Sequence, residues 1–299
     1  MLLAQYKNGN YIVRLFDDGT KARFNKLDNL TPSFAESIDI SITTVCNGAC
    51  QYCYLNCTPQ GKHADLNQPF FDTLHAGTEI AINGNDLTHP DLENFLIRMK
   101  AKGVITNITV NQKHFNSNIE KLKDWQDRQL IWGVGISLTD STDPTLVQNM
   151  HYLKNTILHV IDGLFTAQDI ENLKNKDIKL LILGYKIVGR GKAYYDQNKE
   201  DIEKNIEYLR KNLWEFRKYF TGIGFDTLST AHLEMRKQVG EEIWNFHYMG
   251  NEGTYTFYID ACNGKFSISS MDEEHKWDVT DNVDEMFTFV RNFVSKNGD

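Results

Sequence analysis

The first part of the chain has the alternating pattern of a short β-hairpin. Apolar and polar residues alternate over residues 11–16, and a second such stretch covers residues 20–24. Between them stands Asp17-Asp18-Gly19, and an Asp-Gly pair between alternating stretches is a strong hairpin signal. We therefore predict a small hairpin that precedes the main fold.

From about residue 37 the pattern changes to alternating strands and helices. Short runs rich in Ile, Val and Leu predict strands at residues 38–43, 79–82, 105–110, 132–138, 156–161 and 178–183. Apolar stripes at helical spacing predict helices at residues 91–101, 117–127, 144–152, 167–175 and 199–219. Repeated β-α units with such apolar strands indicate a parallel sheet covered by helices. These sheets carry their functional residues at the carboxyl ends of the strands.

The last part of the chain has a different pattern. Residues 254–260 and 265–269 flank Asn263-Gly264, which predicts a second hairpin. A final helix is expected at residues 283–295. We interpret this tail as a cap on the sheet and not as a separately folding domain.

Composition and charge narrow the class of protein. The chain has 299 residues, of which 41% are hydrophobic and 24% charged, as in an ordinary globular protein with a large core. No apolar run approaches the roughly 18 residues of a membrane span, and the first ten residues do not resemble a signal peptide. We therefore expect a cytoplasmic protein that does not associate with membranes. The formal charge of −8 argues against non-specific nucleic-acid binding, which needs a basic face.

The cysteines are the most informative residues of the chain. Cys46, Cys50, Cys53 and Cys57 fall within twelve residues, whereas Cys262 stands alone. In a reducing compartment such crowding indicates a metal or cluster site and not a disulfide framework. Three thiolates from one loop can hold three irons of a cubane, whose fourth iron then stays open for a small molecule.

Two other interpretations compete with an open cubane. A zinc site would use all four clustered thiolates, although structural zinc sites usually have two close pairs separated by a longer loop. A ferredoxin-like electron carrier would have shorter C-x2-C-x2-C spacings and a Cys-Pro ending, and neither is present here.

The pattern Cys46-x3-Cys50-x2-Cys53, with Tyr52 before the last cysteine and a strand before the first, resembles the motif of the radical SAM superfamily. The resemblance covers residues 35–230 and implies an α/β fold, a partial (β/α)6 TIM-like barrel. Residues 1–34 would form an N-terminal β-hairpin extension, and residues 231–299 a C-terminal α+β cap. Several stretches are similar to uncharacterised radical SAM proteins of bacteria and phages. This similarity does not indicate a substrate.

The resemblance also implies a reaction. The three cysteines would ligate a [4Fe–4S] cluster, and S-adenosylmethionine would chelate the open iron. Reductive cleavage would give a 5′-deoxyadenosyl radical that abstracts hydrogen from a peptide, protein or nucleoside, with an external flavodoxin or ferredoxin as the electron donor. A non-catalytic iron–sulfur protein for electron transfer or regulation is the alternative. Without a second cysteine group no auxiliary cluster is expected, and Cys57 and Cys262 receive no role.

Further cofactor contacts are expected at the strand ends. The family's Gly-Gly-Glu-Pro stretch is matched here by Asn83-Gly84-Asn85-Asp86, which keeps a glycine but lacks the glutamate and the proline. Tyr52 would lie beside the adenine. The full set of expected contacts is Tyr52, Asn83, Gly84, Asn85, Ser137, His159, Lys186 and Arg190. For each strand-end residue an ordinary structural role is the competing interpretation: a turn, a serine bonded to backbone, a core histidine or a solvated basic turn.

Overall fold

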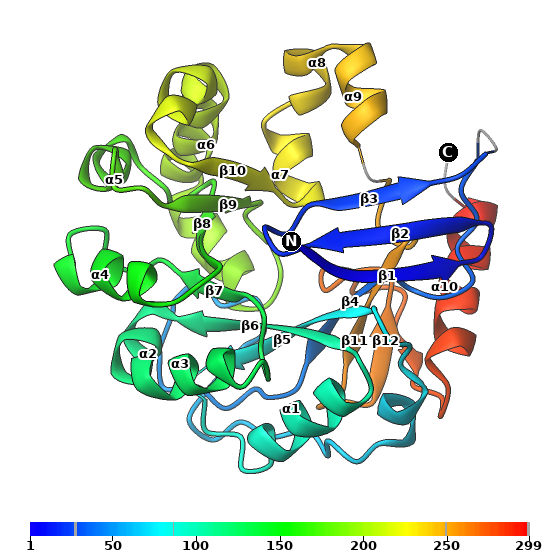
Figure 1. The fold of residues 1–299 in the computed structure, drawn as a ribbon. Coiled ribbons are helices and arrows are strands. Elements are labelled where there is room, and N and C mark those ends of the chain that lie inside the picture. The colour runs from blue at the N-terminus through cyan, green and yellow to red at the C-terminus, as the bar shows by residue number, and fades with distance from the viewer. Residues whose placement is uncertain (27–28, 86, 249, 298–299) are drawn as a thin grey trace.

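The computed structural model describes residues 1–26, 29–85, 87–248 and 250–297. Within them the strands form two sheets (Figure 1). A three-stranded antiparallel sheet contains β1 (Leu2–Asn8), β2 (Tyr11–Phe16) and β3 (Lys21–Phe24). The predicted hairpin is therefore confirmed as β2 and β3. Strand β1 was not predicted, because its sequence LLAQYKN shows no clear alternation.

The main sheet has ten strands in the order β10-β9-β8-β7-β6-β5-β4-β11-β12-β13. The run from β4 to β10 is parallel throughout and follows chain order, as repeated β-α units require. Its strands are β4 (Ser37–Ser41), β5 (Glu79–Asn85), β6 (Ile105–Asn111), β7 (Val134–Ser137), β8 (Thr156–Ile161), β9 (Lys179–Leu183) and β10 (Gly222–Phe225). The predicted strands are all present. Strand β10 was not predicted, because its four residues Gly-Ile-Gly-Phe form no apolar run.

The predicted helices are also present, with changes at their ends. The α-helices are α1 (Leu92–Ala101), α2 (Gln112–Ser117), α3 (Ile119–Asp127), α4 (Pro144–Tyr152), α5 (Ala167–Leu173), α6 (Arg190–Phe216), α7 (Thr227–His232), α8 (Met235–Val239), α9 (Glu241–His247) and α10 (Val283–Asn297). Short 3₁₀ helices cover Pro69–Thr73 and Arg217–Tyr219. Helix α6 starts earlier than predicted and kinks at Asn198, whose backbone is not helical. No helix of the described residues is both long and apolar enough to cross a bilayer.

The two faces of the parallel sheet have different surroundings. Alternate strand residues such as Ile40, Ile82, Ile108 and Val160 are fully buried in one continuous apolar core with the helices. Many of the intervening residues are partly buried or exposed, and several of them are polar, His159 and Asp39 among them. Helices therefore cover one face, and the other face carries the more accessible and more polar residues of the strands.

The sheet is open and does not close into a barrel. Its edge strands are β10 on one side and β13 (Trp277–Asp278) on the other, and no pairing joins them within the described chain. Strand β11 (Thr256–Asp260) pairs in parallel with β4, and β12 (Lys265–Ser267) forms the predicted antiparallel hairpin with β11. The tail that we predicted as a cap thus extends the main sheet, because β11 completes the second edge of β4.

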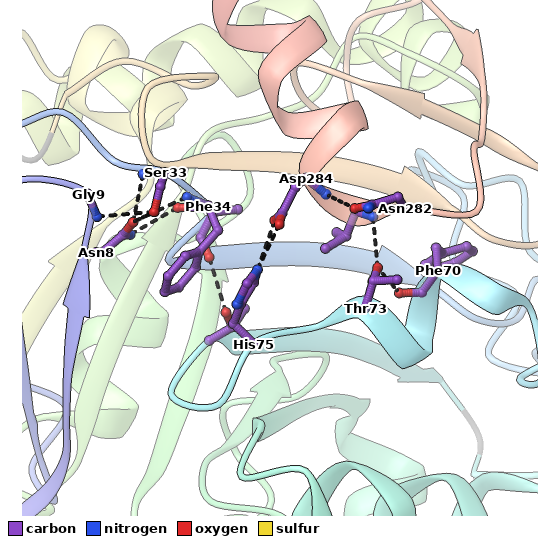
Figure 2. A network of polar contacts seen from close by, with 12 residues as sticks. Asn8, Gly9, Ser33, Phe34, Phe70, Thr73, His75, Asn282 and Asp284 are labelled. Atoms are coloured by element: carbon purple, nitrogen blue, oxygen red, sulfur yellow. Dashed lines mark hydrogen bonds and ion pairs between the residues drawn. The ribbon is translucent and has the colours of Figure 1, made fainter.

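A polar network ties the N-terminal sheet to the last helix (Figure 2). The Asn8 amide donates to the carbonyl of Phe34 at 2.9 Å and accepts from the Ser33 N–H at 2.8 Å. The ring of Phe34 stacks on His75 with centroids 4.1 Å apart, and His75 Nε2 lies 2.8 Å from the Asp284 carboxylate. The two ends of the chain are therefore joined through the segment that precedes β5.

Glu36 is the charged centre of the junction between the two sheets. Its buried carboxylate accepts from the Tyr11 hydroxyl at 2.5 Å and from Arg23 Nε at 2.8 Å. We expect Glu36→Ala to lower the free energy of unfolding by about 3–5 kcal/mol, because Arg23 then stays in a poorly hydrated place without this carboxylate. Urea denaturation measures the change. Glu93→Ala, which breaks an exposed ion pair with Arg128, is the matched control and should cost less than about 1 kcal/mol. Equal losses in the two variants would contradict the prediction.

Candidate functional site at the cysteine loop

The cysteine loop, residues 46–57, begins just beyond the carboxyl end of β4. Backbone bonds close its base, since the Cys46 N–H donates to the Thr58 carbonyl at 3.0 Å and the Thr58 N–H donates to the Thr44 carbonyl at 3.0 Å. The loop therefore leaves and rejoins the fold at one point, on the edge where parallel sheets carry their functional groups.

Gly48 lies among the cysteine sulfurs. Its N–H donates to Cys46 Sγ at 3.3 Å, and the Cys50 thiol donates to its carbonyl at 3.9 Å. Burial raises the pKa of Cys50, and the neighbouring Cys53 and Cys46 add to the shift, so the three thiols are close enough to interact. No three Cys, His, Asp or Glu side chains of the described residues are arranged around a single metal ion. A cubane needs no such arrangement, because each thiolate binds a different iron.

Cys57 lies behind Cys53. It is buried, and the Asn85 amide donates to its sulfur at 3.4 Å. A hydrogen bond with Cys57 lowers the pKa of Cys53 below its ordinary value, against the opposing effect of burial. Cys57 thus contacts one of the three motif cysteines, a role that the spacing alone did not reveal.

Asn83 and Asn85 fix the entry to the cysteine loop. The Asn83 side chain accepts from the Ile42 N–H and donates to the Thr43 carbonyl, both at 2.7 Å. The Asn85 amide also donates to the Thr43 carbonyl, at 3.1 Å. The two side chains that replace the family's Gly and Glu therefore hold β4 and β5 together where the loop begins.

Gly84 stands between these two asparagines and is buried. A Cβ at Gly84 would lie 2.6 Å from the side chain of Ile108, so glycine lets β5 and β6 pack closely here. The backbone contact expected between this stretch and the cofactor stays a prediction. Asp86, which follows in the same motif, lies outside the described residues.

The glycine-rich exit of β9 packs against the cysteine loop. Arg190 donates through Nε to the Cys50 carbonyl at 3.1 Å and through Nη2 to the Cys57 carbonyl at 2.9 Å. Gly189 has φ of 56°, and a Cβ there would lie 2.4 Å from the Tyr54 carbonyl oxygen. The glycine thus permits a close approach of two backbone segments, and the guanidinium binds loop carbonyls. An additional anionic partner for Arg190 stays a prediction.

Lys186 follows β9 in the same exit and contacts two other segments. Its Nζ lies 4.1 Å from the centre of the Tyr54 ring and donates to Ser270 Oγ at 2.8 Å. Burial opposes its charge, but Tyr54 and several carboxylates together raise its pKa above the ordinary value. These carboxylates belong to Asp226, Asp39 and Glu252. Lys186 is therefore a charged side chain in largely acidic surroundings.

Ser137 and His159 are register partners on β7 and β8. The imidazole of His159 lies over Gly135, where a Cβ would come within 2.3 Å of the ring. Burial, with a smaller effect of Lys186, lowers the pKa of His159 to about 4, so the ring is neutral at pH 7. Both residues lie on the more accessible face of the sheet, and their contacts with a cofactor stay predictions.

Tyr52 lies on the side of the loop that faces α6. Its ring meets Tyr194 edge to face with centroids 5.9 Å apart, and burial raises the pKa of its hydroxyl to about 12. The expected contact with adenine stays a prediction.

Asn111, at the end of β6, was missed by the sequence analysis although its amide lies 3.9 Å from Cys50 Sγ. Its position directly after a predicted strand was the signal that could have identified it.

Comparison with known proteins supports the fold. No family model matches the chain, and no curated protein sequence matches it either. Among solved structures, the chain shares its α/β fold with a peptide-binding bacterial protein. Streptococcus suis SuiB bound to its precursor peptide SuiA is 18% identical with a TM-score of 0.57, over 88% of this chain and 68% of SuiB. SuiB bound to S-adenosylmethionine is 16% identical with a TM-score of 0.53, over 88% of this chain and 69% of SuiB.

Proposed function

We propose that this chain is a radical SAM enzyme whose cluster is held by Cys46, Cys50 and Cys53. The observation that carries the proposal is the placement of these three thiols on one loop at the carboxyl edge of a parallel sheet. The donor set suits a [4Fe–4S] cluster, because three sulfurs leave one iron for a small molecule. The likeness in fold to SuiB, which has been solved with S-adenosylmethionine bound, supports the choice of that molecule.

When bound, the cluster would supply the electron that cleaves S-adenosylmethionine into methionine and a 5′-deoxyadenosyl radical, and that radical would abstract hydrogen from the substrate. The chain's own residues hold and orient the parts. Asn83 and Asn85 fix the start of the loop, and Arg190 fixes its end. Tyr52, Gly84, Ser137 and His159 remain the further candidates for cofactor or substrate contact.

The substrate class that we favour is a peptide. SuiB, whose fold this chain shares, has been solved with a precursor peptide bound. The polar, partly accessible inner face of the open sheet gives a substrate with backbone amides and polar side chains many possible partners. The electron would come from an external donor of the flavodoxin or ferredoxin type.

The proposal is tested by anaerobic reconstitution with iron and sulfide, followed by dithionite and S-adenosylmethionine. We expect 5′-deoxyadenosine by liquid chromatography and mass spectrometry, and none from the Cys50→Ala variant. An assembled cluster that leaves S-adenosylmethionine intact under adequate reduction would favour the carrier alternative. Protein that holds one zinc and no iron would favour the structural zinc site.

A further inference from the structure

Lys186 connects two parts of the main sheet that lie near its opposite edges and are not paired with each other. It follows β9, which lies next to the β10 edge, whereas Ser270 follows β12, which lies next to the β13 edge. The 2.8 Å bond from Lys186 Nζ to Ser270 Oγ therefore crosses the open side of the sheet. In a closed barrel, hydrogen-bonded strands would make this connection.

The same ammonium also contacts the cysteine loop. It lies 4.1 Å from the ring centre of Tyr54, the residue directly after Cys53. A cation at this distance over a tyrosine ring is attracted by the electron-rich face, more strongly where water is excluded. One side chain thus joins three segments: the exit of β9, the cysteine loop and the turn after β12.

The surroundings explain why the bridging residue is a cation. Asp39 projects from β4, Asp226 follows β10, and Glu252 precedes β11, so the negative charge comes from both halves of the sheet. Asp226 is itself fixed, because its carboxylate accepts from the N–H groups of Gly184 and Ser229 at 2.9 and 2.7 Å. A positive charge between these groups stabilises the approach of the two halves.

We propose that Lys186 is a positioning residue that fixes the cysteine loop to the C-terminal segment through its contacts with Tyr54 and Ser270. This inference rests on the proposed function in treating the loop as the cluster site.

This role differs from direct recognition of an anionic ligand or from a solvated basic turn. An anion at Lys186 would meet the repulsion of Asp39, Asp226 and Glu252. A solvated lysine would not combine a ring contact with a hydrogen bond to a distant segment. Lys192, six residues further on and exposed, has that ordinary character and provides a matched control.

The test is a double-mutant cycle between Lys186→Met and Tyr54→Leu, read by hydrogen exchange of residues 46–57 in the full-length chain. We expect each single variant to speed exchange of the loop by about three-fold or more, consistent with loss of about 0.7 kcal/mol or more. The double variant should be no faster than the faster single variant, because both changes remove the same contact. Lys186→Arg should restore protection, and Lys192→Met should change nothing.

Additive effects in the cycle, or unchanged exchange in Lys186→Met, would overturn the inference. A second readout is the reduction potential of the reconstituted cluster, which should shift in Lys186→Met and return in Lys186→Arg. The exchange experiment is carried out on iron-free and on reconstituted protein. If the wild-type chain assembles no cluster, the proposed function fails, while coupling between Lys186 and Tyr54 in the iron-free chain is still measured independently.

Discussion

Alanine in place of Cys46, Cys50 or Cys53 should reduce the iron bound after anaerobic reconstitution from about four per chain to near zero, because a cubane held by two thiolates is not retained. The three sulfurs are the protein's whole contribution to the cluster in the proposed site. Iron and sulfide analysis, together with the visible absorbance of the cluster, measures the loss. Formation of 5′-deoxyadenosine should disappear in the same variants.

Cys57→Ala and Cys262→Ala are the matched cysteine controls. Both should keep the full complement of iron, since neither residue belongs to the motif. Cys57→Ala also removes the hydrogen bond to Cys53 and so tests whether that contact is needed for assembly. A complete cluster in any one of the three motif variants would refute the ligand assignment. Loss of iron in Cys57→Ala would show that assembly needs Cys57, either as a ligand or through its hydrogen bond to Cys53.

The second large effect is expected at Gly189. Alanine there must adopt φ near +56°, and its Cβ would lie 2.4 Å from the Tyr54 carbonyl oxygen. The strained backbone alone costs about 1–3 kcal/mol, and the clash forces the cysteine loop away from the start of α6. We expect Gly189→Ala to lower the free energy of unfolding by at least this amount and to weaken the bonds that Arg190 makes with the loop. Urea denaturation and hydrogen exchange of residues 46–57 measure the two effects.

Gly222 provides the control for this substitution. It lies in β10, and a Cβ there would meet nothing within 4 Å. Gly222→Ala should therefore change stability by less than about 1 kcal/mol, in either direction. If Gly189→Ala behaved like Gly222→Ala, the close approach of the β9 exit to the cysteine loop would not be a real constraint.

Much of the fold could be predicted because its strands are strongly apolar. The apolar runs at residues 79–82, 105–110 and 156–161 each predict a strand. Because these strands alternate with helices, the pattern also predicts that they pair in parallel. The openness of the sheet follows from no local pattern, because it depends on which edges remain unpaired after folding. Only the resemblance to a family with a partial barrel implied it. Strand β10 lacked the side chains that produce a pattern, and the pairing of β11 with β4 joins segments from opposite ends of the chain.

The candidate site could be predicted only where its residues are close in sequence. The cysteines share one loop, so their spacing was sufficient to propose a cluster. The sequence singled out Lys186 and Arg190 as cations after a predicted strand, but it did not identify their partners. These are loop carbonyls, a tyrosine ring and a serine from distant segments. Such partners are set by tertiary packing, and no local pattern encodes them.

The parallel pairing of β4 with β11 has a consequence for the order in which this protein matures. Domains form from the N-terminus as the chain is synthesised, yet the strand that leads into the cysteine loop gains its second neighbour only when residues 256–260 have emerged. Until then β4 pairs only with β5, and its other edge has no hydrogen-bonded neighbour in the sheet. Assembly of the proposed cluster should accordingly follow the pairing of β11 with β4.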